Sequence, residues 1–150
     1  MSPDFLLNEQ PLGRMLTMLG KGYLNLLRFR LQHLDIDRYY YALVLIERQD
    51  GIITQQELAV LLDSDKVSIV RIVDYLSGKG YVKRMRKTDD RRKHSLHLTA
   101  KGKQAIPEIK KSFSDLNEIV LNGLENNQIS DLTQTISRIK RNIILNTEPK

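Results

Sequence analysis

Apolar residues recur at helical spacing along most of this chain. One such stretch runs from about residue 12 to residue 34, and another from about residue 129 to residue 143. In both, the apolar side chains follow at alternating steps of three and four, the pattern of a helix that packs on another helix. We therefore expect a long helix near each end. The two seams are Leu12, Leu16, Leu19, Tyr23 and Leu26, and Ile129, Leu132, Ile136, Ile139 and Ile143.

Three shorter helices are predicted in the central part of the chain. The first, at about residues 38–49, follows Asp35-Ile36-Asp37, in which an aspartate can cap the helix. The second begins after Thr54, because Thr54 and Glu57 have the spacing of a capping box. The third, at about residues 65–77, buries one stripe of apolar side chains. That stripe is Ile69, Ile72, Val73 and Leu76, and the opposite face carries Val67, Arg71 and Asp74.

An alternating pattern follows these helices and predicts a β-hairpin. Residues 81–87 form a basic strand pattern, and residues 93–99 alternate between apolar and polar side chains. The turn between them holds Asp89-Asp90-Arg91-Arg92, and Ile52-Ile53 predicts a further short strand. In the second strand, one face holds Leu96 and Leu98, and the other holds Ser95, His97 and Thr99.

The chain returns to helix after the hairpin. Thr99 can cap a helix that continues to about residue 122, and Pro107 should either kink this helix or mark its first turns. The predicted fold class is therefore mainly α with a small β-hairpin (α+β). We divide the chain into an N-terminal arm, a central module and C-terminal helices, at residues 1–36, 37–102 and 103–150.

The net charge of +6 is concentrated in one fifth of the chain. Residues 65–94 contain ten Lys and Arg and four Asp, whereas the remaining 120 residues contain fourteen basic and fourteen acidic side chains. A basic cluster of this density is typical of a surface that binds a polyanion, above all nucleic acid. The alternative is a solvated charged face without a partner.

Composition and motifs exclude several other classes of protein. The 150 residues include no cysteine, so disulfides, cysteine nucleophiles and thiol redox sensing are absent. The apolar runs are too short for a membrane span, and no signal-peptide pattern is visible, so we expect a cytoplasmic protein that does not enter membranes. His33, His94 and His97 are spaced too widely for a metal site. No catalytic motif is present, so we expect no enzymatic activity and no cofactor.

Two helices joined by a tight turn and followed by a basic hairpin form a winged helix-turn-helix. The second of these helices can enter a DNA major groove about 12 Å wide. On it, Lys66 and Arg71 can reach bases or phosphates, and Ser68 can bond to either. Val67 and Val70 lie on the same hydrated face, where they either contact thymine methyl groups or are tolerated surface residues. The candidate recognition residues are Lys66, Val67, Ser68, Val70 and Arg71.

The hairpin tip, or wing, supplies a second candidate DNA contact. A long arginine side chain can enter a narrow minor groove, where the negative potential is strongest. Asp90 and Arg92 have the spacing for a pair in which the carboxylate holds the guanidinium. The alternative is a solvated turn with weak surface ion pairs. The candidate wing residues are Arg84, Arg86, Asp90, Arg91, Arg92 and Lys93.

Several motifs between Thr54 and Gly102 occur together. They are TQQELAVLL, the pattern D-K-x-S-x-x-R-x-x-D-x-L from Asp65 to Leu76, GKGYVKR, and DDRR followed by SLHLTAKG. With these motifs the segment resembles the MarR family of bacterial transcription regulators. The resemblance implies a homodimer that binds a pseudo-palindromic DNA operator, acts as a repressor and is released by a small lipophilic or phenolic ligand.

The resemblance also implies roles for individual residues. Ser68 and Arg71 would lie in the major groove, and Asp90 with Arg92 would form the minor-groove wing. Many members of the family carry Ser or Thr where this chain has Val67 and Val70, which leaves the operator sequence open.

The terminal seams bear on the oligomeric state. They either pack on each other within one chain or form a two-fold interface, and the two arrangements are compatible. The resemblance implies that these N- and C-terminal helices are dimerisation helices. A dimer would place two recognition helices about 34 Å apart, one helical turn of DNA.

Aromatic residues gather where the first helix meets the central module. In the MarR family this junction is a ligand pocket, which makes Phe29, His33, Tyr39 and Tyr40 candidate ligand contacts. The alternative is aromatic packing at a helix corner. Two other functions stay open: a non-specific or architectural winged-helix protein that binds DNA or RNA, and a protein–protein adaptor with the same fold.

Overall fold

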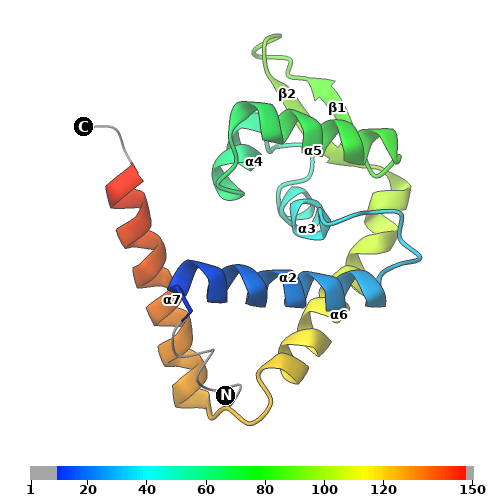
Figure 1. Ribbon diagram of the computed structural model, residues 1–150. Coiled ribbons are helices and arrows are strands. Elements are labelled where there is room, and N and C mark those ends of the chain that lie inside the picture. Colours follow the sequence, from blue (N-terminus) through cyan, green and yellow to red (C-terminus); the bar gives the residue numbers. More distant parts are fainter. Residues whose placement is uncertain (1–9, 148–150) are drawn as a thin grey trace. The chain divides into compact units, whose positions relative to one another are not determined.

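The structure is a computed structural model that describes residues 10–147 (Figure 1). In chain order the elements are α2 (Leu12–Arg30), α3 (Tyr40–Arg48), α4 (Gln55–Leu61), α5 (Lys66–Gly78), β1 (Val82–Arg86), β2 (His94–Leu98), α6 (Ala100–Val120) and α7 (Asn126–Thr147). The two strands form one antiparallel sheet. The predicted fold class, mainly helical with a small hairpin, is confirmed.

The chain divides into two compact units, Met1–Leu116 and Asn117–Lys150. The first unit extends beyond the predicted central module, because α6 buries Ala105, Ile106 and Ile109 in the hydrophobic core. The second unit holds the end of α6 and all of α7. The first nine residues of the predicted N-terminal arm lie outside the described residues, and the role of the terminal segments in dimerisation stays a prediction.

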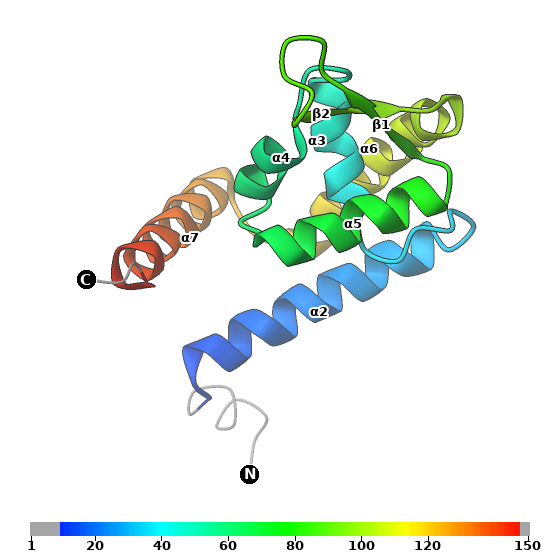
Figure 2. The same cartoon turned by 90° about the horizontal axis from the view of Figure 1, so that it is seen from above.

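α3 lies at the centre of the first unit. In Figure 1 it lies between α2 and the layer of α4, α5 and the hairpin, and Figure 2 shows these elements from above. The predicted aspartate cap does not form, because α3 follows Tyr39 without a side-chain cap. Asp37 instead pairs with Arg28 at 3.0 Å and donates its backbone N–H to the Tyr75 hydroxyl at 3.1 Å. The buried residues of α3 are Tyr40, Ala42, Leu43, Val44, Leu45 and Ile46.

Side-chain caps begin both helices of the helix-turn-helix. The predicted capping box of α4 is present: the Thr54 hydroxyl accepts the Glu57 N–H at 3.2 Å, and Glu57 accepts the Thr54 N–H at 2.7 Å. α5 begins after Asp65, whose carboxylate accepts two backbone N–H groups. The predicted stripe of α5 faces the core, with Ile69, Val73 and Leu76 buried and Ile72 half-buried. Each of the three buried side chains contributes roughly 1.5–3 kcal/mol to stability.

The hairpin pairs Val82 with Leu98 and Arg84 with Leu96. No strand forms at Ile52-Ile53, where one was predicted, and an isolated bridge forms instead at the next residue, between Thr54 and Ser95. Ser95 therefore differs from the expectation of an outward position: it is buried, and its hydroxyl donates to the Met85 carbonyl at 3.3 Å. The added bridge covers a strand face that alternation alone assigns to solvent.

α6 begins where the hairpin ends. The predicted cap is present, since the Thr99 hydroxyl accepts the Gly102 N–H at 3.0 Å. A side chain at Gly102 would place its Cβ 2.3 Å from the Tyr81 carbonyl oxygen, so this close approach requires glycine. Pro107 lies inside the helix, well after its start at Ala100, and therefore does not mark its first turns.

Candidate nucleic-acid interface

The outward face of α5 carries the predicted recognition residues. Val67 is 62% exposed and Val70 is 40% exposed. Lys66 and Arg71 are also exposed, and within the described chain their side chains make no hydrogen bond or ion pair. Two cations and two apolar side chains thus face solvent on one helix, and these residue types can contact phosphates, guanines and thymine methyl groups.

Ser68 is bound to the cap of α5. Its backbone N–H and its hydroxyl each donate to the Asp65 carboxylate, at 2.8 Å. These bonds lower the pKa of Asp65, and the backbone N–H of Ser68 is the largest cause. With its proton donated to Asp65, the Ser68 oxygen retains acceptor capacity, which suits the amino group of cytosine or adenine rather than a phosphate.

The wing tip is a tight turn shaped by Asp90. Its carboxylate accepts the backbone N–H of Arg92 at 3.0 Å, and its carbonyl accepts the backbone N–H of Lys93 at 3.0 Å. The expected pair between the Asp90 carboxylate and the Arg92 guanidinium does not form among the described residues. Asp90 therefore shapes the turn, while Arg91 and Arg92 are exposed without a side-chain partner in the described chain.

Arg84, a predicted wing contact, is engaged within the fold. Its Nη2 lies 2.7 Å from an Asp74 carboxylate oxygen, and its Nε donates to the Gln55 side-chain oxygen at 3.1 Å. The side chain is only 28% exposed. Arg86, two residues further towards the tip, is exposed and has no such partner in the described chain.

The unpaired cations on α5 and the wing contrast with many cations elsewhere in the first unit. Those are matched with carboxylates, in the pairs Arg28–Asp37, Arg30–Asp115, Lys103–Asp50 and Lys110–Glu47. On α5 and the wing, the basic side chains that form no hydrogen bond or ion pair within the described chain are Lys66, Arg71, Lys83, Arg86, Lys87, Arg91, Arg92 and Lys93. The positive charge of the candidate interface is thus left available to an external anion.

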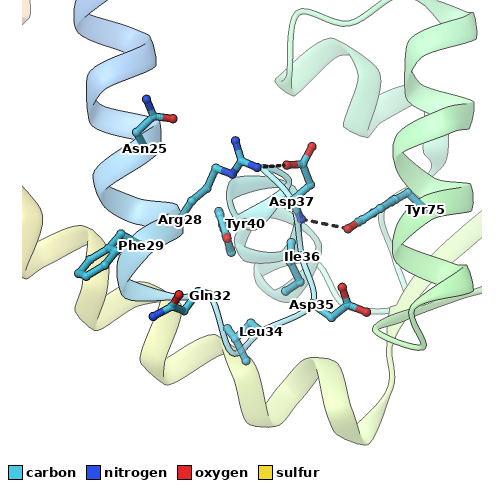
Figure 3. Close-up of a pocket in the computed structure, with 10 residues that line it drawn as sticks. All are labelled: Asn25, Arg28, Phe29, Gln32, Leu34, Asp35, Ile36, Asp37, Tyr40 and Tyr75. Atoms are coloured by element: carbon cyan, nitrogen blue, oxygen red, sulfur yellow. Dashed lines mark hydrogen bonds and ion pairs between the residues drawn. The ribbon is translucent and has the colours of Figure 1, made fainter.

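A cavity of about 560 Å³ lies at the predicted aromatic junction (Figure 3). Of the four candidate ligand contacts, Phe29 and Tyr40 line it. Phe29 is 74% exposed and offers an accessible ring, whereas Tyr40 is 1% exposed and belongs to the core. The lining residues are Asn25, Arg28, Phe29, Gln32, Leu34, Asp35, Ile36, Asp37, Tyr40 and Tyr75.

The other two candidate ligand contacts lie elsewhere. His33 forms a pair with Glu108, with Nε2 2.7 Å from a carboxylate oxygen. Tyr39 packs edge-on against Tyr75, with ring centroids 5.3 Å apart. His33 and Tyr39 are thus absent from the lining of this cavity, and Tyr39 follows the alternative of aromatic packing at a helix corner.

Comparison with known proteins agrees with this arrangement. Residues 39–94 match the family model described as MarR family. The chain contains a MarR family domain. The match begins just before α3 and ends at the first residue of β2, so it covers the helix-turn-helix and the wing tip.

Solved structures extend the likeness beyond the MarR domain. A MarR transcriptional regulator from Methanosarcina mazei Go1 is 28% identical with a TM-score of 0.76, over 88% of this chain and 95% of that one. A mutant MarR from E. coli complexed with operator DNA is 27% identical with a TM-score of 0.78, over 86% and 93% of the two chains. The PcaV transcriptional regulator from Streptomyces coelicolor, in complex with its natural ligand, is 19% identical with a TM-score of 0.80, over 90% and 94%. At that identity PcaV shares the fold alone.

Sequence reasoning missed several residues of the MarR domain and its surroundings. Asp74 and Gln55 were not connected to Arg84, although alternation from buried Val82 puts Arg84 on the inner face of β1. Tyr75 had no sequence signal as a pocket residue, because its partner Asp37 is distant in the chain.

None of the described helices combines the length and apolar character that crossing a membrane requires. Among the described residues, His, Cys, Asp and Glu side chains form no group of three or more that could hold a metal ion.

Proposed function

We propose that this protein is a sequence-specific DNA-binding transcription regulator, a repressor that binds a pseudo-palindromic operator. The observation that carries the proposal is the unpaired positive charge on the exposed face of α5 and at the wing tip. The E. coli MarR that is 27% identical over most of both chains was solved with operator DNA, which supports the same partner here. Because that partner is chromosomal DNA, we infer a cytoplasmic protein. Its likeness to MarR transcriptional regulators supports a role without enzymatic activity.

The proposed contacts divide between the two grooves. In the major groove, Arg71 contacts a guanine or a phosphate, Ser68 accepts a bond from a base amino group, and Val67 with Val70 contacts thymine methyl groups. Lys66 contacts a phosphate. The wing contacts the DNA backbone and the minor groove through Arg86, Arg91, Arg92 and Lys93.

We also propose that the protein acts as a homodimer. α7 buries none of its residues within the chain, and its seam residues Leu132, Ile136 and Ile143 are exposed. α2 leaves Leu12 and Leu19 exposed as well. Apolar stripes of this kind on long helices are typical of an interface with a second copy.

A small ligand is proposed to release the DNA. The cavity beside Phe29 combines an exposed ring with the Arg28 guanidinium and the polar side chains of Gln32 and Asn25 (Figure 3). One wall is Tyr75, which belongs to the recognition helix α5. A lipophilic or phenolic ligand in this cavity would therefore touch the helix that reads the DNA.

Footprinting on the DNA upstream of the protein's own gene tests the proposed function. We expect a protected inverted repeat, with half-sites about one helical turn apart. Arg71→Ala should weaken binding to that repeat by about 1–3 kcal/mol, because it removes a base or phosphate contact. Arg138→Ala, which removes an exposed cation on α7, is the matched control and should change affinity less than twofold.

The alternatives give different results in the same experiment. Diffuse, salt-sensitive protection without a preferred site would indicate an architectural protein or one that binds RNA. An adaptor would show no DNA binding and would keep its protein partner in the Arg71→Ala variant. A reporter gene placed under the protected promoter tests the direction of regulation. Reporter expression that falls, rather than rises, when the gene for this protein is deleted would contradict a role as a repressor.

A further inference from the structure

Arg84 connects three elements of the DNA-binding module. It lies on β1, its Nη2 contacts Asp74 on α5 at 2.7 Å, and its Nε donates to Gln55 on α4 at 3.1 Å. A single guanidinium therefore joins the wing to both helices of the helix-turn-helix. We call Arg84, Asp74 and Gln55 the wing clamp.

Strand alternation explains why this arginine points inward. Val82 and Arg84 share one face of β1, Val82 is buried, and Arg84 is paired with the buried Leu96. The Arg84 stem thus continues the inner face of the hairpin, and its charged end reaches the helices. Lys83 and Met85, on the other face, are exposed.

Apart from the clamp, the wing is attached to the module mainly through β2. The backbone N–H of Leu96 donates to the Ile53 carbonyl at 2.8 Å, and the N–H of Leu98 donates to the Asp50 carboxylate at 2.8 Å. These bonds lie beside the isolated bridge between Thr54 and Ser95. On β1, Val82 is buried in the core, and Arg84 is the next inward side chain towards the tip. Beyond that bridge, the tip at Asp90 is closed by bonds within the turn. The clamp is therefore placed to orient β1 relative to α5.

Asp74 is unusual because it is an acid on the helix that faces DNA. Its side chain is 60% exposed, and a carboxylate there repels phosphates. Its presence weakens the attraction of any DNA, whatever the sequence. A role in orienting the wing, through its pair with Arg84, explains why a carboxylate at this position is useful despite that repulsion.

We propose that the wing clamp sets the position of the wing relative to the recognition helix, which makes Arg84 a positioning residue for operator specificity rather than a DNA contact. The inference rests on the proposed DNA-binding function. Major-groove contacts from α5 and minor-groove contacts from the wing form together only when their spacing matches the DNA. An arginine suits this role, because its planar group presents two donors in a fixed geometry that lysine lacks.

The decisive variant is Asp74→Asn, because charge and positioning act on it in opposite directions. Removing the negative charge strengthens binding to every DNA sequence. Releasing Arg84 weakens binding to the operator alone. Asp89→Asn is the matched control, since Asp89 is an exposed wing acid with no partner in the described chain and its loss changes the charge equally.

We expect Asp74→Asn to lower the ratio of operator affinity to random-DNA affinity about tenfold, the equivalent of about 1.4 kcal/mol. Asp89→Asn should leave that ratio within twofold of the wild type. Titrations of both DNAs at the same salt concentration measure the ratio. Equal ratios in the two variants would overturn the proposal.

Arg84→Lys provides a second test, because it keeps the charge and loses the two-point geometry. A positioning role predicts a loss of specificity like that of Asp74→Asn, whereas a simple phosphate contact predicts near wild-type binding and would overturn the clamp. The pair is partly exposed and so contributes little to folding, and thermal unfolding should confirm that both variants are folded.

Backbone hydrogen exchange without DNA separates this proposal from the proposed function. We expect amides of residues 82–98 to exchange at least threefold faster in Asp74→Asn than in Asp89→Asn, because the wing is less restrained. Unchanged exchange overturns the clamp even if the operator is bound. A third outcome is faster exchange in Asp74→Asn combined with no preferred DNA site for the wild type. That result would support the clamp as a restraint on the wing, but it would overturn both its role in specificity and the proposed function.

Discussion

At the scale of single residues, the partner of a side chain decides its role more than its type does. Arg84, Arg86 and Arg92 are all wing arginines, yet Arg84 alone of the three is paired with a carboxylate within the described chain. Asp65 and Asp90 are both acids of the basic module, and each accepts backbone N–H groups rather than pairing with a cation. In a basic site these acids hold the local backbone in place.

The capping box of α4 carries a pH dependence. The pKa of Glu57 is lowered, chiefly because its carboxylate accepts the Thr54 N–H. A lowered folded-state pKa means that this stabilisation is present above the unfolded-state value of about 4.5 and is lost as pH falls through the folded-state value. Glu57→Gln keeps a capping residue without the titration.

We therefore expect the wild type to lose more stability between pH 7 and pH 3 than Glu57→Gln does, by about 0.5 kcal/mol or less because the carboxylate is exposed. Urea unfolding at a series of pH values measures the difference. Glu118→Gln, on the exposed surface of α6, should follow the wild type. A Glu57→Gln profile that matches the wild type would argue against the cap as the cause.

At the scale of elements, the wing consists of two paired strands and an exposed tip. β1 and β2 are paired along their length, while the tip carries exposed arginines on a turn closed by Asp90. The wing thus carries its exposed arginines at the tip of the hairpin, while the clamp at Arg84 holds the base of β1 against α4 and α5. Both parts are needed if the wing is to reach a minor groove.

Arg92→Ala tests the tip separately from the base. Loss of one cation from a phosphate-lined groove should weaken DNA binding and reduce the slope of log affinity against log salt by about one unit. Affinity measured at several salt concentrations gives both values. Wild-type affinity with a wild-type slope would exclude Arg92 from the interface, and Arg138→Ala again serves as the control.

At the scale of the whole molecule, each compact unit leaves apolar helix surface exposed. In the first unit these residues include Leu12, Leu16 and Leu19, and in the second they include Ile136 and Ile143. A soluble single chain rarely exposes stripes of this extent without a partner. A second copy of the chain is the partner that we propose.

Ile136→Glu tests the dimer on the helical seam of α7. A charge in the interface should produce monomers in sedimentation experiments and weaken operator binding, because two half-sites are then no longer linked. Gln134→Glu adds the same charge to an exposed position on the opposite side of the helix and should leave the dimer intact. A dimer that persists in Ile136→Glu would place the interface elsewhere.

Much of the fold could be predicted because it depends on residues close together in sequence. The caps at Thr54 and Thr99 and the buried stripe that includes Ile69 need only neighbours three or four positions away. Ser95 shows one limit of local patterns: alternation assigns it to the solvent face, but a bridge from Thr54, distant in the chain, buries it. Local spacing also overpredicted the aspartate cap of α3 and the pair between Asp90 and the Arg92 guanidinium.

The sequence by itself determined the helix-turn-helix, the basic hairpin and the local excess of charge, since periodicity, capping and composition are local properties. The tertiary structure decided which charges stay available. It pairs Arg84 with Asp74 and His33 with Glu108, and it places Tyr75 on the wall of the cavity. These contacts join segments far apart in the chain, and only the packing of the helices around the core brings them within bonding distance.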